Sequence, residues 1–216
     1  PTGYHYPELV KVTNKFKTRT DIFADLPERK NGDGRLCEIV HYTKPLEEMK
    51  YLEKTGIRGV FNFTTQHVTR KNNERDREIY CIAIKAWKHK KRLNYVTLPE
   101  RLKTHKNTGS FLNRFSVVDP HGCCHTVVAH IAKDGHYYIF PSENPSIENV
   151  RSISVREAAR LQSFPDDYFF EGKKVRPLNQ NELIKRDTIL VYGEDKYHCY
   201  VQVNPTTFKV VKSSYN

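Results

Sequence analysis

The sequence predicts a fold of the α+β class, with short sheets and a few helices joined by irregular segments and followed by a small β-rich C-terminal element. Three observations support this prediction. Helix signals are confined to three stretches, apolar clusters rich in β-branched and aromatic residues begin at Phe111, and the last thirty or so residues alternate as hairpins do. We expect a main domain over residues 1–172 and a β-rich extension over residues 173–216.

Length and composition are typical of a folded, water-soluble protein. The chain has 216 residues, of which 38% are hydrophobic and 28% charged, enough for one domain with a sizeable core and an appendage. It contains no apolar run long enough to span a membrane, and its first residues lack the pattern of a secretory signal. We therefore expect no membrane association and a location in the cytoplasm, bacterial or phage-like, or in the nucleus.

The first half of the chain predicts irregular structure and two helices. Residues 16–42 indicate loop and short strand, because "LPERKNGDGR" is rich in turn residues. In "TKPLEEMKYLEKTG", Thr43 is a candidate N-cap, Pro45 fits the first turn and Gly56 fits the helix end. A second helix is predicted over residues 73–87. Its inward face is expected to carry Ile79, Ile82, Ala83, Ala86 and Trp87.

The second half predicts strands around one short helix. The clusters "FSVV", "HTVVAHIA" and "HYYIF" favour a strand, a turn at Asp134-Gly135 and a return strand. Ser154 and Glu157 have the spacing of a capping box, which predicts a helix from Val155 to Ser163 that ends before a proline. Further on, the alternating sequence predicts a hairpin with its turn at Gly193-Glu194-Asp195, plus a third strand.

The charge of the chain favours nucleic acid as its partner. Lys and Arg outnumber Asp and Glu by 36 to 25, which gives a net charge of +11. Such an excess attracts polyanions. The positive residues cluster mid-chain in "VTRKNNER", "KAWKHKKR" and "RLKTHK", whereas the alternative, a charged surface that serves only solubility, requires no clustering. We therefore expect nucleic acid as the partner.

The five cysteines predict neither disulfides nor a metal site. Their number is odd and none forms a Cys-x-x-Cys pair, so neither a disulfide framework nor a zinc knuckle is indicated. We expect no metal.

Two segments carry a resemblance to a known family. "RSISVREAARLQSFPDDYFFEG", residues 151–172, resembles the ninth motif of DNA (cytosine-5) methyltransferases. "HTVVAHIAKDGHYYIFP", residues 125–141, is similar to the end of that family's target-recognition domain. With weaker likeness upstream, the resemblance covers roughly residues 16–172. The long ordered pattern of the ninth motif makes it specific.

The resemblance implies recognition of a short DNA sequence from the major groove. The family's Thr followed by a small aliphatic residue falls on Thr126-Val127, where a hydroxyl can bond a base edge and Val can pack on a thymine methyl group. The alternative is that both are ordinary strand residues. The predicted DNA contacts, which include candidate phosphate ligands, are Thr126, Val127, His125, His130, Lys133, Arg114, Arg70 and Lys71.

The resembled ninth motif implies a scaffold beneath the recognition loops. Glu157 is expected to cap its helix, while Arg156 and Arg160 are expected to anchor loops by ion pairs or to touch phosphate rather than to read bases. The predicted scaffold residues are Ser154, Arg156, Glu157, Arg160 and Gln162.

The family's catalytic parts have no counterpart in this sequence. Methylation at carbon 5 needs a cysteine nucleophile, which the family carries after Pro, an acid in Glu-Asn-Val, and an S-adenosylmethionine loop, Phe-x-Gly-x-Gly. No Cys here follows Pro, and Glu143-Asn144 is followed by Pro145 where the family has Val. The "NGDGR" turn is a poor cofactor loop. The family's final Gly-Asn-x-x-Pro motif is missing after "FFEG" as well. We therefore expect no catalytic residue and no cofactor site in this chain.

Two functions remain open. The first is a target-recognition subunit or fragment of a cytosine-5 DNA methyltransferase, active with a catalytic chain that supplies the nucleophilic Cys and binds S-adenosylmethionine. The alternative is a stand-alone DNA-binding specificity module of a restriction or regulatory protein, with no methyl transfer. A nuclease is less favoured, because the only acidic cluster nearby, at Pro165-Asp166-Asp167, belongs to the end of the predicted helix.

Overall fold

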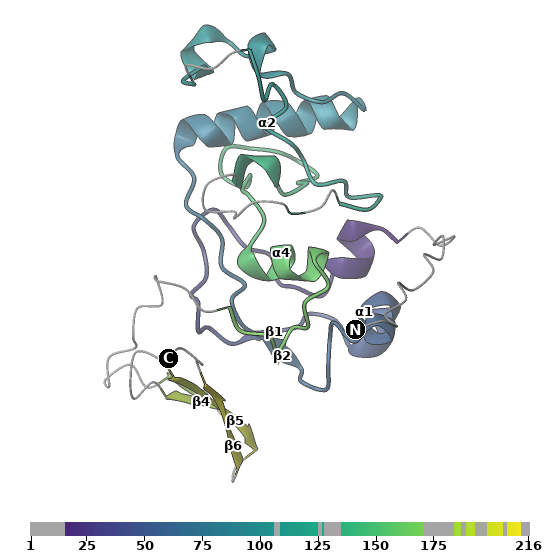
Figure 1. Ribbon diagram of the computed structural model, residues 1–216, viewed down its shortest axis with the longest axis vertical. Coiled ribbons are helices and arrows are strands. Elements are labelled where there is room, and N and C mark those ends of the chain that lie inside the picture. Colours follow the sequence, from purple (N-terminus) through teal and green to yellow (C-terminus); the bar gives the residue numbers. More distant parts are fainter. Residues whose placement is uncertain are drawn as a thin grey trace, which may run out of the picture.

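The computed structural model describes residues 16–105, 109–124, 127 and 135–170, together with the backbone of four strands between residues 184 and 212 (Figure 1). Helices and short strands alternate along the chain, so the predicted mixture of α and β structure is confirmed. In Figure 1, helix α4 (Val155–Leu161) lies between helix α2 (Glu74–Lys88) above it and the strand pair β1–β2 below. Within the described part of the chain, no helix is long and apolar enough to cross a membrane.

The N-terminal part of the described chain folds into short pieces. A π-helix, η1, spans Thr18–Ile22, and strand β1 (Val40–His41) pairs antiparallel with β2 (Phe63–Thr64). The prediction of one helix over residues 43–56 is wrong in its first half. The chain forms a 3-10 turn, η2 (Leu46–Glu48), and the α-helix α1 occupies only Lys50–Thr55, because Met49 between them leaves helical geometry. The predicted end of this helix at Gly56 is confirmed.

That stop depends on a glycine in the left-handed region. Gly56 has a φ of 67° and donates its N–H to the carbonyl of Glu53. A side chain there would be strained, whereas glycine adopts this conformation freely. The chain can therefore turn sharply at the end of α1 and bury Ile57.

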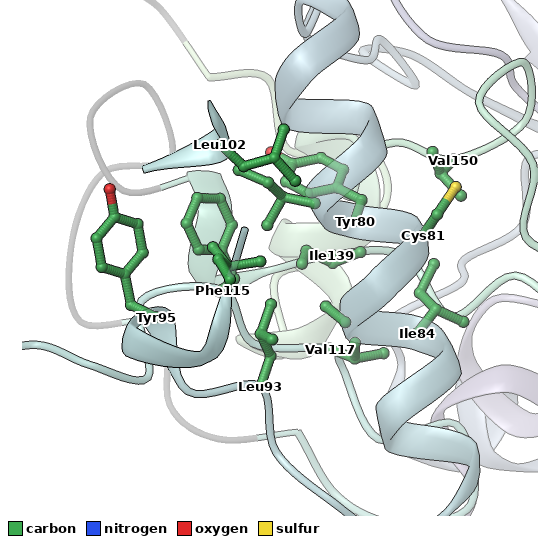
Figure 2. Packing of buried hydrophobic residues seen from close by; sticks show 13 residues of the cluster. Tyr80, Cys81, Ile84, Leu93, Tyr95, Leu102, Phe115, Val117, Ile139 and Val150 are labelled. Atoms are coloured by element: carbon green, nitrogen blue, oxygen red, sulfur yellow. The ribbon is translucent and has the colours of Figure 1, made fainter. Parts of the chain in front are cut away.

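Helix α2 is the longest element and carries the first core. Its N-cap Asn73 accepts a hydrogen bond from the Asp76 N–H. Its buried face is rotated from the predicted one, since Tyr80, Cys81 and Ile84 are buried and Ala86 and Trp87 only half-buried. The short 3-10 turns η3 (Tyr95–Thr97) and η4 (Glu100–Leu102) close this core. Figure 2 shows Leu93, Tyr95, Leu102, Phe115, Val117, Ile139 and Val150 packed around α2.

A second core lies between α1, α4 and η1. It consists of Ile22, Phe23, Met49, Leu52, Ile57, Val118, Tyr138, Ile153 and Ala158. Ile139 of the first core joins the second, because its carbonyl accepts a hydrogen bond from the N–H of Val118 at 3.0 Å. The predicted strand after the Asp134-Gly135 turn begins later than expected. Residues Gly135–Tyr137 form a 3-10 turn, η5, and Asp134 lies outside the described residues.

The C-terminal strands form an antiparallel meander. Strands β3 (Ile184–Arg186), β4 (Ile189–Tyr192), β5 (His198–Asn204) and β6 (Thr207–Lys212) pair in that order. The predicted hairpin corresponds to β4 and β5, in which Val191 faces Val201. Its predicted turn at Gly193-Glu194-Asp195 lies outside the described residues. The sheet has one more strand than the sequence predicted.

Candidate nucleic-acid interface

Residues 125–134, here called the recognition segment, contain the predicted recognition pair Thr126-Val127, and the structure describes Val127 among them together with the residues on either side. On the N-terminal side, the Thr18 hydroxyl donates to the carbonyl of Gly122 at 2.7 Å. The Gln162 side-chain amide donates to the carbonyl of Val127, also at 2.7 Å. On the C-terminal side, the Ser116 N–H donates to the carbonyl of His136 at 3.0 Å. The core therefore holds Val127 and these described flanking residues.

The predicted DNA contacts fall into four groups. His125, Thr126, His130 and Lys133 lie outside the described residues. Val127 is half-buried against the second core, while Arg70 and Lys71 are exposed. Arg114 is buried. The structure therefore leaves the DNA contacts as predictions, and it fixes the surroundings of four of them.

Arg114 supports a turn from inside the protein. Arg114 is only 9% exposed, and its guanidinium lies 4.3 Å from the ring centroid of Tyr95. Nε donates to the carbonyl of Phe111 at 2.9 Å, and Nη2 donates to that of Ser110 at 2.8 Å. These bonds engage the guanidinium inside the protein, and its role as a phosphate contact stays a prediction.

The capping box predicted for α4 is present. The Ser154 hydroxyl oxygen accepts from the Glu157 N–H at 3.0 Å, and Glu157 Oε2 accepts from the Ser154 N–H at 2.6 Å. Arg151 donates to both carboxylate oxygens of Glu157, at 2.7 and 2.8 Å. Burial opposes the charge on Glu157, but Arg151 and the Ser154 N–H hold its pKa below the usual value. The helix start is therefore locked by a buried ion pair.

A buried histidine extends this cap to the N-terminal part of the chain. His67 Nδ1 lies 2.8 Å from the Ser154 hydroxyl, and Nε2 lies 2.8 Å from the carbonyl of Pro27. Burial is the main cause that lowers the pKa of His67. The neutral ring then donates from Nε2 to the carbonyl and accepts from the hydroxyl at Nδ1, a tautomer that we assign from these partners.

Arg160 is the centre of a buried charge network. It donates to Asp25 Oδ1 at 2.5 Å, to Asp166 Oδ2 at 2.5 Å, and to the carbonyl of Ile22 at 2.5 Å. Asp25 also accepts from Arg58 at 3.1 Å. Burial disfavours the charge on Arg160, but the two carboxylates raise its pKa above the usual value. The network ties η1 to α4, as the predicted ion-pair anchor requires.

Arg156 anchors the chain on the other side of α4. It is fully buried and donates to the carbonyls of Thr65, Pro165 and Tyr168, at 2.9, 3.2 and 2.8 Å. Like Arg160, it is occupied inside the protein. We conclude that α4 presents these arginines to neighbouring loops, whereas Gln162, at its C-terminal end, reaches the recognition segment.

Positive charge gathers along α2 and the segments beside it. Residues 68–106 contain twelve Lys and Arg against four Asp and Glu, which is most of the net positive charge of the chain. Several of these charges are paired, for example Arg101 with Glu78. The exposed Lys and Arg of this basic region are Arg70, Lys71, Arg75, Lys85, Lys88, Lys90, Lys91, Arg92 and Arg101. Such a surface attracts the phosphates of nucleic acid.

The "NGDGR" turn does not have the form of an S-adenosylmethionine loop. The "NGDGR" turn packs against the chain itself, since Asp33 and Thr69 exchange hydrogen bonds and a Cβ on Gly34 would lie 2.6 Å from the carbonyl of His67. The glycine therefore serves close approach of protein backbone and leaves no cradle for a cofactor. Burial raises the pKa of Cys81, and that of Cys124 to about 11, so neither thiol is activated as a nucleophile. No group of metal-ligating side chains occurs among the described residues.

Comparison with known proteins gives the family. Residues 7–183 match the C-5 cytosine-specific DNA methylase family. Residues 164–216 match a domain of unknown function, DUF4738. Over 183 residues, 82% of its length, the chain is 43% identical to "Type II methyltransferase M.Bpa9945I" of Bacillus paralicheniformis. It is 37% identical over 84 residues, 39% of its length, to "Type II methyltransferase M.AgeI" of Thalassovita gelatinovora.

The chain covers only part of these relatives, 40% of the first and 18% of the second. A third, "Putative type II methyltransferase M.OihORF3336P" of Oceanobacillus iheyensis, is 39% identical over 77 residues, which are 36% of this chain and 15% of the relative. The family match covers most of the chain, and it includes both the segment at residues 125–134 and the α4 scaffold that supports it. The chain belongs to the C-5 cytosine-specific DNA methylase family.

Proposed function

We propose that this chain recognises a short sequence of double-stranded DNA for a cytosine-5 DNA methyltransferase, as its target-recognition subunit or fragment. The observation that carries the proposal is the support of the described residues around Thr126. Gly122 and Val127 accept hydrogen bonds from Thr18 and Gln162, and α4, which ends just before Gln162, is held by buried ion pairs. Residues already held in place lose little conformational freedom on binding, which favours affinity.

In this proposal, base reading and phosphate binding belong to different surfaces. Thr126 and Val127, flanked by His125 and His130, read base edges in the major groove. Lys133 and the exposed pair Arg70 and Lys71 contact phosphates, which position the duplex without reading its sequence. The basic region along α2 strengthens the attraction of the duplex.

The methyl chemistry is supplied by a catalytic partner. That chain or domain binds S-adenosylmethionine, provides the cysteine nucleophile and receives the flipped cytosine. The packing of the "NGDGR" turn against the chain itself, and the greater length of the relatives, support this division. Duplex DNA as the ligand agrees with the predicted location, cytoplasmic or nuclear.

A segment exchange tests the proposal. This chain replaces the matched 40% of M.Bpa9945I, and the methylated cytosines are mapped by sequencing. We expect methylation within the duplex sequence that this chain enriches by itself from a random library. A chimera that methylates only elsewhere, or transfer of labelled methyl groups by this chain alone, would contradict the proposal. If the chimera is inactive although the chain enriches one sequence, the stand-alone specificity module is supported instead.

A further inference from the structure

The turn at residues 110–114 presents an aromatic side chain to solvent. Phe111 is 71% exposed, and its φ of 54° lies in the left-handed region. Residues other than glycine, and bulky ones above all, are disfavoured there because Cβ crowds the backbone. Residues held in such conformations concentrate at binding and catalytic sites, where the surrounding structure maintains them. The position combines two unfavourable features, an exposed ring and a strained backbone.

The surrounding structure holds this turn rigidly. The Phe111 carbonyl accepts from both the N–H and the Nε of Arg114, at 3.2 and 2.9 Å. The next carbonyl, of Leu112, accepts from the N–H of Tyr95 at 2.7 Å. Tyr95 is fully buried and stacks on Phe115 with ring centroids 6.2 Å apart, as Figure 2 shows beside α2. The ring of Phe111 therefore projects from a fixed base.

The turn is tied to η5 and lies next to positive charge. The Ser116 N–H donates to the carbonyl of His136, the second residue of η5. The five residue steps from Phe111 to Ser116 can span at most about 18 Å, the length of about five base-pair steps at about 3.4 Å each. The exposed Lys90, Lys91 and Arg92 come just before Tyr95 in the chain. A duplex that contacts the protein beside His136 is therefore within reach of the ring.

We propose that Phe111 stacks against or inserts between the base pairs of the bound duplex. This inference rests on the proposed function. An apolar side chain on a rigid base can part a base step and kink the duplex, and an aromatic ring offers its face to either base. Tyr168, which is also exposed, differs because its ring packs on those of Phe164 and Phe170, at 5.0 and 4.8 Å. Charge complementarity favours duplex DNA over a protein partner at this position.

Fluorescence of 2-aminopurine tests the inference on the full chain. The probe is the duplex that the wild-type chain enriches from a random library, with 2-aminopurine placed at one position after another. We expect increased fluorescence at one step on binding, lost in Phe111→Ala together with about tenfold or more of the affinity. Val60→Ala is the matched control, because Val60 is 96% exposed and apolar, and it leaves both signals unchanged.

A glycine at the same position separates the ring from the turn. Phe111→Gly relieves the left-handed backbone, so we expect its melting temperature to rise while its affinity falls as in Phe111→Ala. If both variants bind the duplex as tightly as the wild-type chain, and binding changes the fluorescence at no position, this inference is overturned and the proposed function is left standing. Failure of the wild-type chain to prefer any duplex would overturn both.

Discussion

The side-chain amide of Gln162 donates a 2.7 Å hydrogen bond to the main-chain oxygen of Val127, 35 residues earlier in the sequence. This bond joins the end of α4 to the recognition segment. The buried network of Arg160, Asp25 and Asp166 fixes α4, so Val127 is held through Gln162 by the core.

Gln162→Ala tests this link. The side chain is exposed, so its loss should leave the free energy of unfolding nearly unchanged. We expect affinity for the preferred duplex to fall by about 0.5–1.5 kcal/mol, the worth of one hydrogen bond. Ser163→Ala, next along the exposed end of α4, serves as the control in a fluorescence-anisotropy titration. Equal affinities of the two variants would exclude a role for the bond.

Asp25→Ala tests the charge network. Asp25 is fully buried between Arg160 and Arg58, so its removal leaves both guanidinium groups short of a counter-ion. We expect the free energy of unfolding to fall by about 3–5 kcal/mol in urea titrations. Glu143→Ala breaks the pair with Arg19, in which the Glu143 side chain is 73% exposed, and should cost at most about 1 kcal/mol. Similar losses in both variants would show that burial does not decide the effect.

His67 predicts a pH dependence of stability. Burial lowers its pKa in the folded chain below 6.5, so the unfolded chain binds the proton first as pH falls. The free energy of unfolding should therefore fall with decreasing pH, from about 6.5 down to the lower pKa of the folded state. His67→Gln has no such titration but can keep both hydrogen bonds. Parallel stability curves for wild type and variant between pH 7.5 and 5 would refute the assignment.

Arg70 and Lys71 predict a change in salt dependence. If each contacts a phosphate, Arg70→Ala and Lys71→Ala should each reduce the slope of log affinity against log salt by about 0.9. The loss should be the same on preferred and random duplexes, because phosphates carry no sequence information. Lys50→Ala, an exposed lysine on α1, controls for net charge. A control with the same reduced slope would mean that only total charge matters.

Local signals in the sequence predicted the elements that depend on local chemistry. The Ser154–Glu157 spacing predicted the start of α4, and Gly56 the end of α1, because caps involve residues three or four apart. The partners of Arg160 and Ser154 were missed. Asp25 lies 135 residues from Arg160, and His67 lies 87 residues from Ser154, so no periodicity or spacing reports these contacts. The rotated face of α2 has a similar cause, since packing of Tyr80 against Phe115 decides which side is buried.

The most direct test of base reading by this chain is the ratio of its affinities for preferred and random duplexes, measured for wild type and Thr126→Ala in one buffer. If Thr126 bonds a base edge, the variant loses affinity for the preferred duplex by about 1–3 kcal/mol and almost none for random DNA, so the ratio collapses. An equal loss on both duplexes, or a ratio near one for the wild-type chain, would contradict the account.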